Sequence, residues 1–153
     1  MGLRVTQFIA IILTALALVP AGAHLLELAH KITLDRAQYL TVQQLYRGWA
    51  FLGAVLIAAL LANLTLTIRS RRRVGPMRLA AIATLLLAAN LTIFFIWTFP
   101  ANQVTGNWTV MPADWEALRN QWEYSHAVNA LLTFLALSAT LASSLSWPAA
   151  SPD

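Results

Sequence analysis

The sequence has 153 residues, of which 59% are hydrophobic and 10% are charged, whereas a soluble domain normally has about 25% charged residues. This composition predicts that lipid surrounds most of the protein. The absence of cysteine excludes disulfides, thiolate metal sites, cysteine nucleophiles and iron–sulfur clusters. The formal net charge of +4 has a membrane explanation, given below, so we expect no nucleic-acid partner.

Four apolar segments follow in chain order, and each approaches the roughly 20 residues that cross a hydrocarbon core of about 30 Å. They cover residues 5–28, 46–68, 79–99 and 120–145. Backbone groups in lipid need internal partners, so each segment is predicted to be a helix. The fold class is therefore all-α: a transmembrane four-helix bundle forming one domain, residues 1–147, with a disordered C-terminal tail at residues 148–153.

The first segment has an alternative interpretation. Arg4, an apolar run and the small residues Ala21-Gly22-Ala23 are also typical of a cleaved secretory signal. Cleavage would leave three spans and a new N-terminus at His24. The apolar character continues through residues 25–28, which favours an uncleaved span.

A run of arginines between the second and third segments predicts the orientation. Arg69, Arg71, Arg72, Arg73 and Arg78 are five of the ten basic residues, and the positive-inside rule assigns such loops to the cytoplasm. Four spans then leave both termini cytoplasmic. The loops at residues 31–44 and 100–119 are expected on the other face, where five tryptophans cluster as interfacial anchors.

Ionisable residues inside spans are costly, and they are the first candidates for function. His24 and Glu27 lie near the outer end of the first span, and Glu123 and His126 near the outer start of the fourth. Each pair has i, i+3 spacing, which puts both side chains on one helix face. On antiparallel helices the reversed order brings all four groups to a similar depth.

Paired Glu-x-x-His helices build carboxylate-bridged metal sites in helical bundles. The four side chains predict a site for a metal ion, and imidazole with carboxylate suits iron, copper or zinc. One alternative is haem held between His24 and His126. The other is a set of ion pairs, Glu27 with Arg47 and Glu123 with Arg119. His30 is expected to be interfacial, and Lys31 to extend its ammonium into the headgroups.

A second group of polar and aromatic residues is predicted at the same face. Its members are candidates to contact a substrate or to orient the metal ligands, and they are Tyr46, Arg47, Asn102, Trp108 and Trp122. Pro100 is expected to end the third span. After Pro112, a short amphipathic outer-loop helix is predicted, with Asp114 as its cap and Trp115 on its apolar face, lying over the mouth of the bundle. Asn63 and Asn90, inside spans, are expected to bond across helices.

Three blocks carry a resemblance to a known family. They are His24-Leu-Leu-Glu-Leu-Ala-His-Lys31, Tyr39 through Trp49, and Phe99-Pro-Ala-Asn102 continuing through Trp108, Pro112 and Trp115 to His126. The chain resembles the small four-span membrane proteins that include the anthrone oxygenases of polyketide pathways. The resemblance implies a four-helix bundle and oxidation of an aromatic or quinone-like substrate by dioxygen.

The function expected from the sequence is that of a membrane oxidoreductase. A metal centre near the outer leaflet would act on a lipophilic small molecule reached from the lipid bilayer. The alternative is a non-catalytic membrane protein, either a metal or haem carrier or a structural subunit, whose polar cluster fixes helix packing. A transporter is less favoured, because transporters usually have repeats or broken helices with polar groups at the midplane. Whether the bundle forms a homo-oligomer stays open.

Overall fold

The computed structural model describes residues 2–147, and within that range the chain is helical without strands. The elements are α1 (Leu3–Lys31), α2 (Arg36–Gln43), η1 (Gln44–Tyr46), η2 (Trp49–Leu52), α3 (Gly53–Arg69), α4 (Val74–Ile93), the π-helical turn η3 (Phe94–Thr98), α5 (Phe99–Val104) and α6 (Trp115–Leu145). The predicted tail at residues 148–153 lies outside the described residues.

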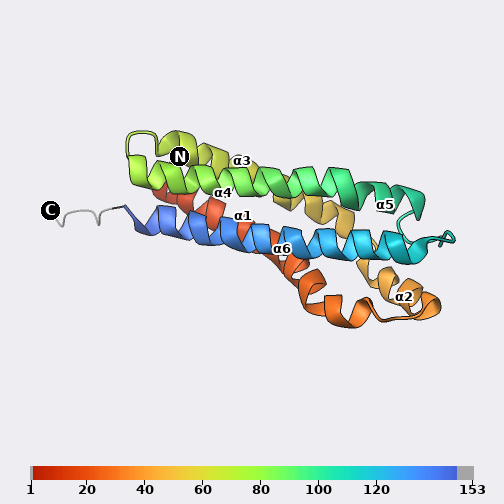
Figure 1. Ribbon diagram of the computed structural model, residues 1–153. Helices are drawn as coiled ribbons and strands as arrows, with labels where there is room; N and C mark the ends of the chain where they lie inside the picture. Colours follow the sequence, from red (N-terminus) through yellow and green to blue (C-terminus); the bar gives the residue numbers. More distant parts are fainter. Residues whose placement is uncertain (1, 148–153) are drawn as a thin grey trace.

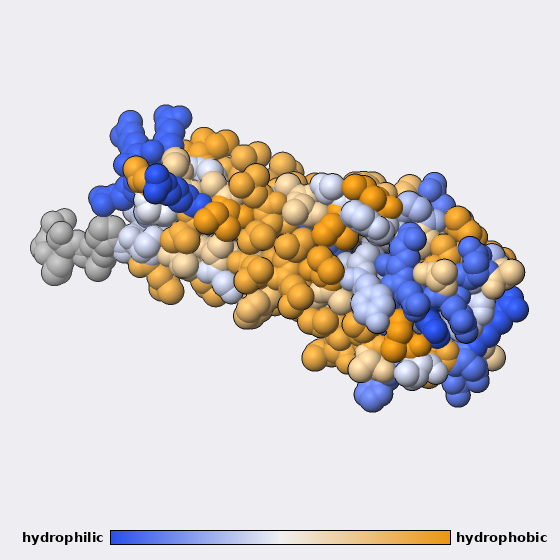
Figure 2. Space-filling model, in the orientation of Figure 1, coloured by the Kyte–Doolittle hydropathy of each residue, from blue (hydrophilic) through white to orange (hydrophobic). Residues whose placement is uncertain are grey.

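Within the described part of the chain, four helical stretches are long and apolar enough to cross a membrane, which confirms the predicted all-α four-helix bundle. They are Leu3–Lys31, Trp49–Arg69, Val74–Val104 and Trp115–Leu145. Figure 2 shows a hydrophobic belt between hydrophilic groups at the two ends of the molecule. Large apolar side chains such as Phe8 and Phe134 point outward from this belt, as expected where lipid is the solvent. The chain is thus a multi-pass integral membrane protein.

The bundle is a ring in which α1 packs on α3, α3 on α4, α4 on α6 and α6 on α1. Small side chains let these helices approach closely, and the central cluster consists of Ala17, Ala59, Ala83, Leu87 and Ala136. The arginine loop lies at one end of the bundle, and α2 and α5 lie at the other (Figure 1). We call these the arginine end and the polar end.

Two asparagines join the spans, which confirms their predicted role. Asn63 Nδ2 donates to Thr14 Oγ1 over 2.9 Å, and its Oδ1 accepts from Thr140 Oγ1 over 2.7 Å, so one amide links α1, α3 and α6. Asn90 Nδ2 donates to Thr133 Oγ1 over 2.9 Å and to a backbone carbonyl of α6. Lipid offers no competing partner to these amides, so such bonds fix which helix faces meet.

The third span does not end at Pro100, contrary to the sequence prediction. The helix passes through the π-helical turn η3 and continues as α5 to Val104, with Pro100 in the first turn of α5, where a missing N–H costs little. Gln121 Nε2 on α6 donates to the Trp97 carbonyl over 2.7 Å, and Thr98 Oγ1 bonds Ser125 Oγ over 2.7 Å. A widened turn thus carries the helix past the proline.

The helix expected after Pro112 begins at Trp115, but it is the start of α6 and runs unbroken to Leu145. Asp114 makes no side-chain capping bond, so its predicted role as a cap is wrong. The short helix of the outer loops is instead α2, whose Asp35 and Gln38 form a reciprocal capping box. Its Tyr39 packs among aromatic residues of the polar end.

Candidate functional site at the polar end

The structure brings the two predicted His/Glu pairs together where α1 meets α6. The rings of His24 and His126 lie 4.3 Å apart between centroids, with their planes inclined by 31°. Glu123 is fully buried, whereas the side chain of Glu27 is 44% exposed. The opposite order of the two pairs on antiparallel helices therefore produces the convergence that their spacing predicts.

Lys31 lies at the centre of this cluster, and its predicted place in the headgroups is wrong. Its side chain is only 4% exposed. The ammonium Nζ lies 3.1 Å from Glu123 Oε1, 3.2 Å from His24 Nδ1 and 3.6 Å from Glu27 Oε2. Lys31 follows Glu27 by one helical turn and His24 by two, so all three occupy one face of α1. Glu123, the buried partner on α6, holds the ammonium inside the bundle.

Two tyrosines from the outer segments close the cluster. Tyr39 of α2 donates its hydroxyl to Glu123 Oε1 over 2.9 Å, and Tyr46 donates to Glu27. Burial raises the pKa of both phenols above the ordinary value, and the neighbouring carboxylates raise them further. Both hydroxyls therefore stay protonated and act as donors to the carboxylates.

Aromatic rings surround the imidazoles. The His24 ring lies 4.6 Å from Tyr46, 5.6 Å from Trp49 and 4.9 Å from Trp122 between centroids. The His126 ring lies 4.2 Å from that of Trp122, edge to face. The Lys31 ammonium lies over the Tyr46 and Trp122 rings, at 4.7 and 5.1 Å from their centroids, within cation–π range. Imidazole and aromatic groups thus form one continuous wall.

A cavity of about 540 Å³ opens beside this wall and runs into the bundle. Its outer part is bordered by Tyr46 of η1, Trp49 of η2 and Trp108, and its inner part by Asn90 and Thr133. Both imidazoles line it. Ligand pockets are typically of this size, largely apolar with a few polar groups, so the cavity has room for a drug-sized molecule with aromatic rings.

The five residues predicted to contact a substrate or to orient the metal ligands also line this cavity; they are Tyr46, Arg47, Asn102, Trp108 and Trp122. Trp122 Nε1 donates to Asn102 Oδ1 over 2.8 Å, and the Arg47 guanidinium bonds the side chain of Gln44. Within residues 2–147 neither Asn102 nor Arg47 bonds a carboxylate of the cluster. Asn102 positions the indole of Trp122, and Arg47 lies exposed at the mouth.

The alternative ion pairs with arginine do not form within the described chain. Arg119 Nη1 donates to the Leu34 carbonyl over 2.7 Å, and its guanidinium stacks 4.7 Å from the Trp115 ring. Both glutamates pair with Lys31 instead. His30 is exposed at the end of α1, as expected of an interfacial histidine.

The fit of a metal ion can be judged from the donor atoms. Within residues 2–147 no group of three or more histidine, aspartate and glutamate side chains is arranged to hold a metal ion. Three atoms that could ligate a metal, from His24, Glu27 and Glu123, surround one position, and the Lys31 ammonium occupies it. Haem between the two imidazoles does not fit this arrangement either, because their rings are in direct contact and leave no space for a porphyrin between them.

Sequence reasoning missed three contributors to the site. The sequence could have placed Lys31 in the site, because Lys31 shares a helix face with His24 and Glu27. No sequence pattern places Tyr39 in the site, since its hydrogen bond to Glu123 depends on how α2 folds back over the bundle. Asn90 was expected to bond across helices, but nothing in the sequence showed that it also lines a cavity.

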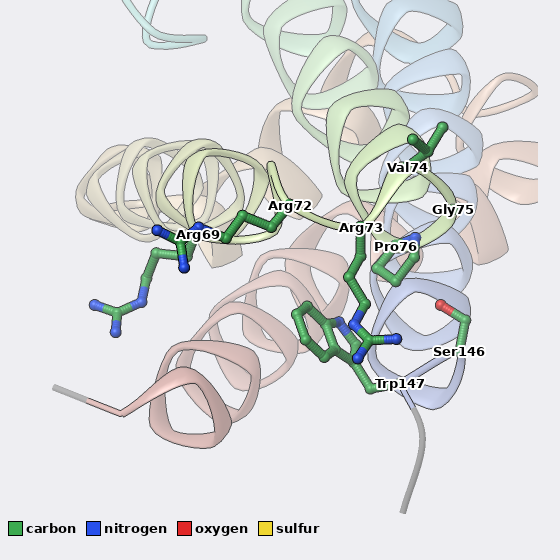
Figure 3. A pocket seen from close by; sticks show the side chains of 8 residues that line it. All are labelled: Arg69, Arg72, Arg73, Val74, Gly75, Pro76, Ser146 and Trp147. Atoms are coloured by element: carbon green, nitrogen blue, oxygen red, sulfur yellow. The ribbon is translucent and has the colours of Figure 1, made fainter.

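An open depression of about 690 Å³ occurs at the arginine end (Figure 3). Arg69, Arg72 and Arg73 border it, and Arg73 stacks 5.5 Å from the Trp147 ring. Within residues 2–147, its lining contains no aspartate, glutamate or histidine. These features fit the predicted interfacial, orienting role of the arginines.

Comparisons with family models, curated proteins and solved structures find no match to this chain. The resemblance to the anthrone oxygenase-like family therefore remains a prediction that rests on the three sequence blocks.

Proposed function

We propose that this protein is a membrane oxidoreductase that oxidises a lipophilic aromatic or quinone-like molecule in the cavity at the polar end. The observation that carries the proposal is the cavity wall, where two imidazoles lie among aromatic rings beside space of about 540 Å³. Planar aromatic ligands stack favourably on such rings. A site bordered by lipid-facing helices also suits a substrate that dissolves in the bilayer.

His126 is the group best placed to accept a proton from the substrate. It lines the cavity, and within residues 2–147 its ring makes no hydrogen bond to protein. A hydroquinone-type substrate loses two protons and two electrons as it becomes a quinone. One dioxygen molecule takes up the two electrons and the two protons and becomes hydrogen peroxide, which balances the reaction. Proton acceptance by a positioned histidine typically contributes about 10²–10⁴-fold to such a rate.

Oxygen consumption by the purified protein tests the proposal. Protein in lipid nanodiscs is supplied with a series of reduced naphthoquinones, and oxygen uptake is followed with an electrode. His126→Asn should slow uptake by about 10²-fold or more, while His30→Asn, at an exposed histidine outside the cavity, should not change it. Quenching of tryptophan fluorescence checks that ligand still binds. Lack of uptake across the substrate series, or a full rate in His126→Asn, refutes the proposal.

One observation favours a second candidate, a non-catalytic protein whose cluster fixes helix packing. The buried pair of Lys31 and Glu123 joins α1 to α6 at 3.1 Å, and such pairs can specify one arrangement of helices. In that case aromatic ligands would not quench the cavity tryptophans, and His126→Asn would alter only the melting temperature.

The predicted orientation is part of the proposal. The arginine end would face the cytoplasm with both termini, and the polar end would lie at the opposite face. Substrate would then enter from the outer leaflet or from the outer aqueous side.

A further inference from the structure

We propose that the Lys31 ammonium is the resident cation of the polar cluster and takes the place that a metal ion would occupy. Three atoms that could ligate a metal ion surround Nζ, at 3.1 Å for Glu123 Oε1, 3.2 Å for His24 Nδ1 and 3.6 Å for Glu27 Oε2. These two carboxylates and one imidazole are three of the four side chains on which the metal prediction was based; the fourth is His126. The chain supplies its own positive charge to this set.

The ammonium is surrounded by acceptors. A protonated lysine has three N–H donors and no acceptor. Glu123 Oε1 and His24 Nδ1 lie within hydrogen-bond distance of it, and Glu27 Oε2, at 3.6 Å, forms a longer ion pair. The faces of Tyr46 and Trp122 cover the ammonium further. A buried charge is tolerated when it is paired and hydrogen-bonded in this way. The ammonium is therefore stabilised inside the cluster without a metal ion.

Lys31 also determines which nitrogen of His24 carries the hydrogen. Because the ammonium can only donate, Nδ1 of His24 accepts, and the hydrogen of the neutral ring is on Nε2. His24 thereby becomes an N–H donor on the cavity wall, beside His126 as the acceptor. By fixing the tautomer of His24, Lys31 becomes a positioning residue for the proposed oxidation. Only this role of Lys31 rests on the proposed function.

Metal binding by a lysine variant tests the inference as a gain of function. Purified wild-type protein incubated with Co²⁺ and then desalted should retain less than about 0.1 equivalent. Lys31→Met keeps the length of the side chain and removes the charge, so His24 Nδ1 and the two carboxylates can close on a metal at bonds of about 2 Å. It should retain about one equivalent and show visible cobalt bands. The matched control, Arg36→Met, removes an exposed cation at the same end and should bind none.

Two further measurements use wild-type protein, so they stand even if Lys31→Met does not fold. Lys31 is the only lysine in the sequence, so an amine-reactive ester reports on one ε-ammonium. We expect labelling of Lys31 to be at least about 100-fold slower than that of a free lysine analogue in the same detergent, because the group is buried. Nitrogen-15 spectra of labelled histidine, assigned with His24→Asn, should show His24 with its hydrogen on Nε2.

The outcomes separate this inference from the proposed function. Wild-type protein that holds one equivalent of metal, or a folded Lys31→Met that holds none, overturns it. So does rapid labelling of Lys31 in the folded protein, or a His24 hydrogen on Nδ1. None of these readouts involves substrate, so failure of the oxygen-uptake assay leaves them unchanged.

Discussion

The hydroxyl of Tyr39 on α2 donates to Oε1 of Glu123 on α6 over 2.9 Å, at the same oxygen that pairs with Lys31. A short helix outside the spans is thereby attached to a carboxylate inside the bundle. The other oxygen of Glu123 is buried and has no hydrogen-bond partner within residues 2–147. The carboxylate therefore depends on Tyr39 and Lys31 for its stabilisation.

Tyr39→Phe should destabilise the protein. The substitution keeps the ring packed against Trp108, 5.1 Å away between centroids, and removes one hydrogen bond to a buried charge. Such bonds contribute about 1.5–3 kcal/mol. Unfolding by denaturant in detergent micelles measures the loss. Tyr124→Phe, at an exposed tyrosine, is the matched control and should cost less than about 0.5 kcal/mol. Equal losses in the two variants would contradict the structure.

The two glutamates should respond differently to amide substitution. Glu123→Gln leaves the buried Lys31 ammonium without its closest anionic partner, and removing one member of a buried pair typically costs about 3–5 kcal/mol. Glu27→Gln affects a side chain that is 44% exposed, where an ion pair contributes only about 0–1 kcal/mol. Melting curves of both variants in one detergent test this order. A larger loss for Glu27→Gln would show that the pairing is assigned wrongly.

Two phenols should resist ionisation at high pH. Burial raises the pKa of Tyr39 and Tyr46 above the ordinary value of 10.0. The protonated form is favoured in the folded state, so this contribution to stability is complete below about pH 10 and is lost as the pH rises further. Ultraviolet difference absorbance at pH 11 should show both as un-ionised in the folded protein and ionised after unfolding. Full ionisation in the folded protein would disprove their burial.

Reporter fusions test the proposed orientation. A reporter inserted near Ser70 or fused after residue 153 should report the cytoplasm, and one inserted near Gly106 should report the opposite side. An outside signal at the C-terminus, or the same side for Ser70 and Gly106, would contradict the four-span orientation.

The fold followed from the sequence because length and hydropathy leave few choices in lipid. Four apolar runs can only be helices there, and small loops between them make neighbours antiparallel. The ends of the helices were less predictable. Pro100 lies inside a helical stretch because a π turn precedes it, and no local pattern announces that turn.

The candidate site was predictable in part of its membership but not in its interactions. The spacing of His24 with Glu27 and of Glu123 with His126 predicts convergence, and the structure shows it. What holds these groups together was not predictable, since the burial of Lys31 depends on a carboxylate from the far end of the chain. Local composition at the end of a span favours a lysine extended toward the headgroups, but a tertiary ion pair prevails over that tendency here.

The π turn at Phe94–Thr98 also sets the phase of the helix that follows it. In effect, the turn accommodates one inserted residue within an otherwise α-helical span, so the residues before and after it keep their helix faces. The same extra residue in plain α geometry would rotate everything after it by about 100° around the helix axis. Asn102 would then turn away from Trp122, while Asn90, before the turn, would keep its bonds to α6. The turn thus lets one span present Asn90 to the inner half of the bundle and Asn102 to the cavity mouth.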